Sequence, residues 1–131
     1  MTHFAFLYIV PPALALLAMI AAARAEEKEG PEPSMVYNNA CRTCHSMKEG
    51  DNRQGPSLHG VVGRKAGSLA GFQFSPSMQN SGIVWDEATL DKFIANPDQV
   101  VNGNGMKPYG GIDDADQRKE IIAFLKSISG K

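Results

Sequence analysis

The sequence predicts an all-α domain, and three observations lead to this prediction. Apolar residues recur with helical spacing in two segments of the C-terminal half, a proline-serine pair is suited to start a helix near residue 34, and no useful length of sequence alternates apolar and polar residues as a half-buried strand would. The length of 131 residues is typical of one small domain. With 43% hydrophobic and 21% charged residues, a wholly disordered or collagen-like chain is excluded.

The N-terminal segment has the composition of a secretion signal. Residues 4–23 contain no charged side chain, and Ala23–Ala25 is a small-x-small site that a signal peptidase could cut. We therefore expect residues 1–25 to be a signal peptide and the protein to be exported, to the periplasm in a bacterium. The alternative is an uncleaved membrane anchor formed by residues 4–23, because twenty apolar residues could just span a bilayer.

The acidic, proline-broken segment 26–33 predicts a solvated linker before a folded domain of residues 34–131. A first helix is expected from Pro33 and Ser34 onward, and no helix breaker follows before Gly50. Between residues 46 and 84 glycine and proline interrupt the chain repeatedly and no period is sustained. Such a long irregular segment in a small domain is expected to wrap around something.

Two amphipathic helices are predicted in the C-terminal part. The first lies between Asp86, a favourable N-cap, and Pro97, which ends it. Its apolar residues share one face: Leu90, Phe93 and Ile94. The second helix has apolar residues at i, i+3, i+4 and i+7: Ile121, Phe124, Leu125 and Ile128. Acidic residues precede it and Lys126 lies near its end, as the helix dipole favours.

The charge balance and the cysteine count exclude several functions. Thirteen Lys and Arg against 14 Asp and Glu give a formal charge of −1, so the chain lacks the basic excess that binds nucleic acid through counterion release. Two cysteines cannot build the multiple disulfides of a small secreted scaffold or a four-cysteine metal site. We therefore expect the two cysteines to act together.

Residues 41–45 read Cys-Arg-Thr-Cys-His, the C-x-x-C-H sequence that attaches a c-type haem. On a helix, positions i, i+3 and i+4 share a face, so Cys41, Cys44 and His45 would all face one planar ring. The thiols can form thioethers with the vinyl groups, and the imidazole can bind the iron. A thioredoxin-like pair needs a βαβ context, a zinc site needs two further ligands, and a structural disulfide leaves His45 unexplained.

Two methionines are candidates for the opposite face of the iron. Of the six methionines, two lie in the leader and two flank the attachment motif too closely to reach across the ring, which leaves Met78 and Met106. Methionine usually fills space in a core. Met106 lies in a glycine-rich, otherwise polar loop where filling is not needed, so the sequence favours Met106.

With these motifs the chain resembles the class I cytochromes c, especially the small soluble bacterial and mitochondrial type. The resemblance runs from residue 34 to residue 128. The matching landmarks are Cys41–His45, Gly55–Gly60, Gly63–Gly67, Trp85, Asn96–Pro97, Gly103–Met106 and Gly110–Ile112. The resemblance implies a cytochrome c fold with three main helices and long loops wrapped around one covalently bound haem c. Cys41 and Cys44 would hold this haem, and His45 and Met106 would be the axial ligands of its iron.

The resemblance also implies roles for residues around the haem. The Pro56 carbonyl would accept the N–H of the His45 imidazole, and Arg64 and Trp85 would be partners of a buried haem propionate. His59 is expected to make structural hydrogen bonds and not to bind iron.

The chain departs from its mitochondrial relatives near the haem. Phe74 and Phe93 stand where those relatives carry tyrosines, and Met78 stands where they carry an asparagine. A drier pocket disfavours the extra positive charge of ferric iron, so we expect a raised reduction potential. An inserted residue in Lys107–Tyr109 leaves open which side chain covers the haem edge. Acidic residues such as Asp98 replace several lysines of the exposed edge, so weaker steering toward acidic partners is expected.

The implied function is one-electron transfer by a monomer that is not an enzyme and takes no chemical substrate. The expected donor is a quinol-oxidising cytochrome complex or a dehydrogenase, and the expected acceptor is an oxidase or reductase, in a respiratory or photosynthetic chain. The alternative is a haem enzyme or gas-binding sensor whose sixth iron site is open or labile. A module tethered to one membrane complex through residues 4–23 is a further possibility.

Overall fold

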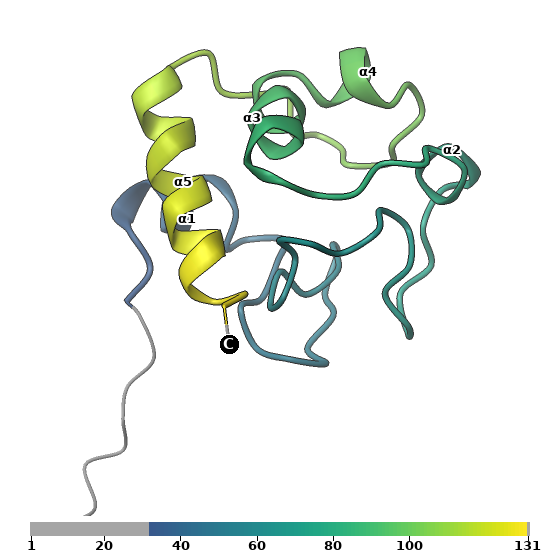
Figure 1. The fold of residues 1–131 in the computed structure, drawn as a ribbon, viewed down its shortest axis with the longest axis horizontal. Helices are drawn as coiled ribbons and strands as arrows, with labels where there is room; N and C mark the ends of the chain where they lie inside the picture. The colour runs from purple at the N-terminus through teal and green to yellow at the C-terminus, as the bar shows by residue number, and fades with distance from the viewer. Residues whose placement is uncertain (1–31, 131) are drawn as a thin grey trace, which may run out of the picture.

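A computed structural model of the protein describes residues 32–130, so the predicted signal peptide and most of the predicted linker lie outside the described residues. Helices follow one another in the order α1 Met35–Ala40, α2 Pro76–Gln79, α3 Glu87–Ala95, α4 Pro97–Val100 and α5 Ala115–Ser127 (Figure 1). Between residues 32 and 130 no strand forms, and a single isolated antiparallel bridge joins Lys65 and Val84. The predicted all-α fold class is confirmed.

Within the same range, no helix has the length and the apolar character needed to cross a membrane.

Polar side chains cap the N-termini of the helices. Each cap accepts a hydrogen bond from a backbone N–H of the first turn: Ser34, Ser75, Asp86, Asn96 and Asp114. Asp86 forms a capping box, because Thr89 Oγ1 in turn accepts the Asp86 N–H at 2.8 Å. The predicted limits of α3, from the Asp86 cap to the residues before Pro97, are therefore confirmed.

The first helix is shorter than the sequence predicts. It ends at Ala40, so the Cys41–His45 motif lies beyond α1 in a hydrogen-bonded turn and not on a helix. One bond of helical type continues into this turn, because the His45 N–H donates to the Cys41 carbonyl at 3.0 Å. The Arg42 N–H bonds to the Tyr37 carbonyl at 3.3 Å and the Cys44 N–H to the Cys41 carbonyl at 3.2 Å, and neither bond has the i to i−4 spacing of an α-helix. The Cys44 carbonyl accepts from a distant partner, the N–H of Gly55, at 2.8 Å, so a returning loop holds the end of this turn.

The irregular segment 46–84 contains one helix that the sequence analysis did not predict. This helix, α2, has four residues, a Ser75 cap and Pro76 in its first turn. Four residues make barely one turn, which is too short to show a hydrophobic period.

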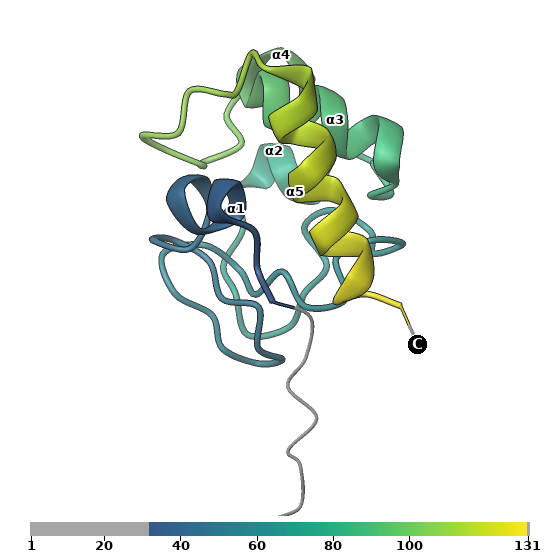
Figure 2. The same ribbon diagram turned by 90° about the vertical axis from the view of Figure 1, so that its left-hand side faces the viewer.

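The core forms where α5 packs against α1 and α3, and Figure 2 shows α1 beside the middle of α5. The rings of Tyr37 and Phe124 lie 4.6 Å apart between their centroids and are tilted by 57°. Ile121 is fully buried in the same cluster. The first helix of the domain is therefore packed against the last.

Replacing the α5 partner in this contact should destabilise the protein strongly. We expect Phe124→Ala to lower the free energy of unfolding by about 3–5 kcal/mol, because the change leaves a cavity beside Tyr37. Denaturant unfolding of the haem-loaded protein measures the effect. A loss below about 1 kcal/mol would contradict the central place given to this contact.

Replacing Tyr37, the α1 partner in the same contact, should change the free energy of unfolding in the opposite direction. Tyr37 is 1% exposed, and its hydroxyl has no hydrogen-bond partner among the described residues. Burial raises the pKa of Tyr37 to about 12, so the hydroxyl is neutral. Tyr37→Phe keeps the ring and removes the unpaired group, and we expect the free energy of unfolding to rise by about 1 kcal/mol. A decrease of similar size would show that the hydroxyl has a partner.

Candidate functional site

The loops and helices enclose a largely apolar cavity of about 320 Å³. Its wall includes all four predicted site residues: Cys41, Cys44, His45 and Met106. The first three come from the turn after α1, and Met106 comes from the loop between α4 and α5. The fold therefore brings together residues that the sequence places in opposite halves of the domain.

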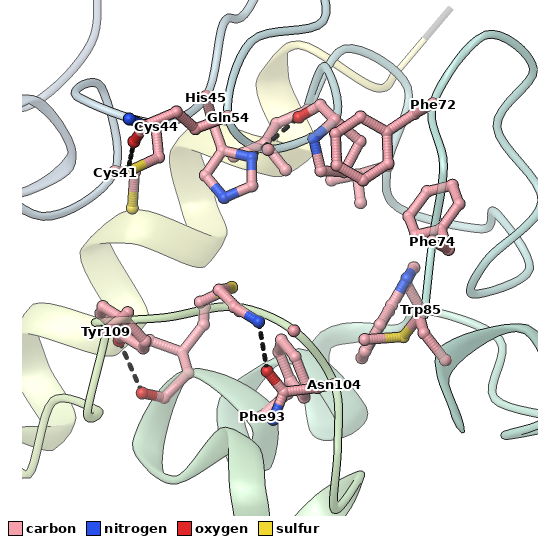
Figure 3. Close-up of a pocket in the computed structure, with 18 of the residues that line it drawn as sticks. Cys41, Cys44, His45, Gln54, Phe72, Phe74, Trp85, Phe93, Asn104 and Tyr109 are labelled. Atoms are coloured by element: carbon pink, nitrogen blue, oxygen red, sulfur yellow. Dashed lines mark hydrogen bonds between the residues drawn. The ribbon is translucent and has the colours of Figure 1, made fainter. Parts of the chain in front are cut away.

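The predicted ligands approach the cavity from different sides. In Figure 3 the two cysteines and His45 lie along one wall, with the His45 ring pointing into the space, and Phe93 and Asn104 lie along the facing wall. The backbone N–H of Met106 donates to Asn104 Oδ1 at 2.7 Å, so Met106 belongs to the wall opposite His45.

His45 is held in the state that binds a metal. Its Nδ1 lies 2.8 Å from the Pro56 carbonyl oxygen, which can only accept, so Nδ1 carries the proton and Nε2 keeps a lone pair. This is the hydrogen bond that the sequence analysis expected. Burial lowers the pKa of His45, and the positive charge of Arg64 lowers it further against the opposing effect of the Pro56 bond. The imidazole is therefore neutral at pH 7.

Gly55 leaves the space that the His45 ring occupies. A Cβ on Gly55 would lie 2.3 Å from Cε1 of the ring and 2.6 Å from Nδ1, so any side chain would displace the imidazole. In the sequence this glycine is only one of the landmarks of the resemblance. The structure shows that Gly55 provides the room and Pro56 the acceptor that together orient His45.

The two cysteines are free thiols on the same wall. Burial, with a smaller effect of the neighbouring Cys44, raises the pKa of Cys41 to about 11. A neutral sulfur is therefore favoured here, and a thioether is neutral. Within the described residues no group of three or more His, Cys, Asp or Glu side chains is arranged to hold a metal ion, so the ligand set of a zinc site is not assembled there.

Both candidate methionines line the cavity. Met78 is 6% exposed and belongs to the hydrophobic core, which is the usual filling role of methionine. Met106 is only partly buried, in a loop whose backbone is held by Asn104. These environments agree with the sequence preference for Met106.

Arg64 and Trp85, the expected propionate partners, also lie on the cavity wall. The Arg64 guanidinium donates to the carbonyls of Ser57, at 2.9 Å, and His59, at 3.3 Å, so a positive charge is fixed at the cavity. The Trp85 ring packs on Phe93 with centroids 4.9 Å apart. The hydrogen bonds of His59 in the structure come from its backbone, whose carbonyl accepts from Arg64 and whose N–H donates to Ser57 Oγ at 3.3 Å, so the structural role of its imidazole stays a prediction.

The sequence leaves open which side chain of the inserted loop covers the haem edge, and in the structure Tyr109 is the partly buried one. It lines the cavity, is partly buried, and its hydroxyl donates to the Ile94 carbonyl at 2.7 Å. Lys107 also borders the cavity but is exposed and paired with Asp98. The role of Asn104 on the facing wall was missed, because a single asparagine in a glycine-rich loop has no distinguishing pattern.

The residues present fit a haem c. The two thiols and the neutral imidazole lie on one wall, and a methionine loop lies on the other. Aromatic and aliphatic side chains form most of the remainder, and the partly buried cation of Arg64 can pair with a carboxylate. Phe74, Met78 and Phe93 are all on the wall, so the positions singled out as apolar departures do face the cavity.

Comparison with known proteins supports the same assignment. Residues 29–125 match the family model described as cytochrome C oxidase, cbb3-type, subunit III. The chain is 49% identical over 88 residues to cytochrome c2 iso-2 of Magnetospirillum fulvum, covering 67% of this chain and 91% of that protein. It is 44% identical over 95 residues to cytochrome c2 of Rhodomicrobium vannielii, covering 70% and 73% respectively.

The solved structure of cytochrome cH from Methylobacterium extorquens has the same fold. The two structures superpose with a TM-score of 0.64 at 36% identity, and the match covers 73% of this chain and 99% of that one. Because these matches extend over most of each relative and most of the folded domain, the chain belongs to the c-type cytochromes, electron carriers with a covalently bound haem c.

Proposed function

We propose that Cys41 and Cys44 attach the haem as thioethers and that His45 and Met106 bind its iron from opposite faces. The observation that carries this proposal is the orientation of His45, whose Nδ1 is bonded to Pro56 at 2.8 Å and whose ring points across the cavity toward the wall that carries Met106. The facing position of Met106 and the core position of Met78 support the choice of sulfur ligand.

The bound haem supplies one-electron chemistry, as its iron cycles between the ferrous and ferric states. The chain's own residues set the conditions for this exchange. His45 provides a neutral nitrogen, Met106 provides a soft sulfur that favours the ferrous state, and the apolar wall disfavours the additional charge of the ferric state. Two protein ligands leave no position for a chemical substrate, so the proposed role is a carrier and not an enzyme.

We further propose that the protein is exported and works between membrane complexes of a respiratory or photosynthetic chain. The uncharged segment 4–23 and the cleavage site at Ala23–Ala25 support export to the periplasm. A quinol-oxidising cytochrome complex or a dehydrogenase would be the donor, and an oxidase or reductase the acceptor. A small monomeric carrier would meet both through short-lived contacts.

The charges near the cavity favour weak electrostatic steering. Two exposed basic side chains are paired within the chain: Arg53 lies 3.1 Å from Asp51, and Lys107 pairs with Asp98. These pairs partly neutralise the positive charge that would attract an acidic partner.

A matched pair of variants tests the sulfur ligand. We expect Met106→Leu to abolish the thioether-to-iron absorption of the ferric protein and lower the reduction potential, because leucine keeps the volume but has no sulfur. Met78→Leu should leave the absorption unchanged. The reverse result would assign the ligand to Met78. A high-spin ferric spectrum and ready carbon monoxide binding in the unmodified protein would instead favour a gas-binding sensor or haem enzyme.

The apolar wall gives a separate prediction. Phe93 is 7% exposed, lines the cavity and packs on Trp85. Phe93→Tyr adds a hydroxyl that can stabilise the ferric charge, so we expect the reduction potential to fall. A redox titration of both proteins measures the change, and an unchanged potential would show that the dryness of this wall does not set the potential.

A further inference from the structure

The loop that carries Met106 is held by a buried asparagine. Asn104 is 6% exposed, and its Oδ1 accepts the backbone N–H of Met106 at 2.7 Å. Its Nδ2 donates to the Val101 carbonyl at 3.0 Å and to Asp98 Oδ1 at 2.9 Å. Both ends of the amide are therefore used, one toward Met106 and the other toward the end of α4.

Asp98 and Lys107 complete a ring of contacts around this amide. One carboxylate oxygen of Asp98 accepts a hydrogen bond from Asn104, and the other forms an ion pair with Lys107. Lys107 directly follows Met106 in the chain. The side chains of Asp98 and Lys107 are 53% and 58% exposed, so their ion pair by itself contributes little. The bonds of Asn104, which are buried or partly buried, carry more weight, because a backbone N–H shielded from water and left without a partner is costly.

A second anchor lies on the other side of Met106. The Tyr109 hydroxyl donates to the Ile94 carbonyl at 2.7 Å, and the Ile112 N–H donates to the same carbonyl at 3.0 Å. The loop returns to α3 at this point. Between the two anchors, Gly105 has φ of +82°, a conformation that allows the turn by which Asn104 reaches Met106.

We propose that Asn104 is a positioning residue that keeps the Met106 thioether on the iron, with Asp98 orienting its amide. This inference rests on the proposed function, in which Met106 is the ligand. A thioether is an uncharged ligand, and the glycines on either side of Asn104 provide no rigidity of their own. The amide fixes the backbone of Met106 itself, so the sulfur can leave the iron only when the turn opens.

The rate of ligand exchange tests this role directly. Imidazole can bind ferric iron only after the thioether leaves, so at saturating imidazole the observed rate measures the opening of the loop. We expect Asn104→Ala to raise this limiting rate about tenfold, which corresponds to about 1.4 kcal/mol. Asn102→Ala is the matched control, an exposed asparagine two residues away in the same loop, and should change the rate less than twofold.

A second variant covers the case in which Asn104→Ala does not fold. Asp98→Ala alters an exposed side chain, and we expect it to raise the limiting rate about threefold through the loosened amide. Unchanged rates in the folded variants, while Met106→Leu abolishes the thioether absorption, would overturn the role of Asn104 and leave the ligand assignment intact. An unchanged absorption in Met106→Leu would overturn the ligand assignment itself, and with it the role of Asn104.

Discussion

The contact between Tyr37 and Phe124 fixes the place where α1 ends, and the attachment motif begins at that end. Their rings lie 4.6 Å apart at the crossing of α1 and α5, elements at opposite ends of the folded domain. Cys41 is the C-cap of α1, so the position of both cysteines and of His45 follows from this crossing. A six-residue helix would be marginal alone, and its packing against α5 supplies the stability that its length does not.

Neutrality is the common property of the groups that meet at the cavity. Burial and the positive charge of Arg64 keep the His45 imidazole neutral, the Pro56 acceptor fixes which nitrogen carries its proton, and burial disfavours a charged sulfur at Cys41. Arg64 is the exception, and backbone carbonyls hold its guanidinium at the wall although burial lowers its pKa. A cation held by backbone carbonyls in a largely apolar wall suits a cofactor with an apolar body and charged carboxylates.

Local features were predictable from the sequence, and features set by distant contacts were not. The Asp86 cap and the apolar face of α5 depend on neighbouring residues, and both predictions are confirmed. The turn that follows Ala40 is tied to a distant residue by a bond from the Gly55 N–H to the Cys44 carbonyl, and Gly55 belongs to a returning loop. The irregular segment 46–84 as a whole is ordered by scattered backbone hydrogen bonds, such as the one from the Ala66 N–H to the Ile83 carbonyl at 2.8 Å. These bonds follow no period in the sequence. Cys41, Cys44 and His45 were predictable because the C-x-x-C-H spacing itself identifies a site of haem attachment.

Of the two proposed iron ligands, His45 is anchored more firmly than Met106. This difference decides whether an external ligand can reach the iron. His45 directly follows Cys44, is oriented by Pro56 and has its space reserved by Gly55, so it cannot leave without disrupting the attachment turn. Met106 has no neighbouring attachment point, and its backbone is held by the Asn104 amide and the Tyr109 anchor. The same cavity with a loosened loop would expose the iron to external ligands. The polar contacts of a single loop, more than the cavity, therefore separate an electron carrier from a ligand-binding haem protein.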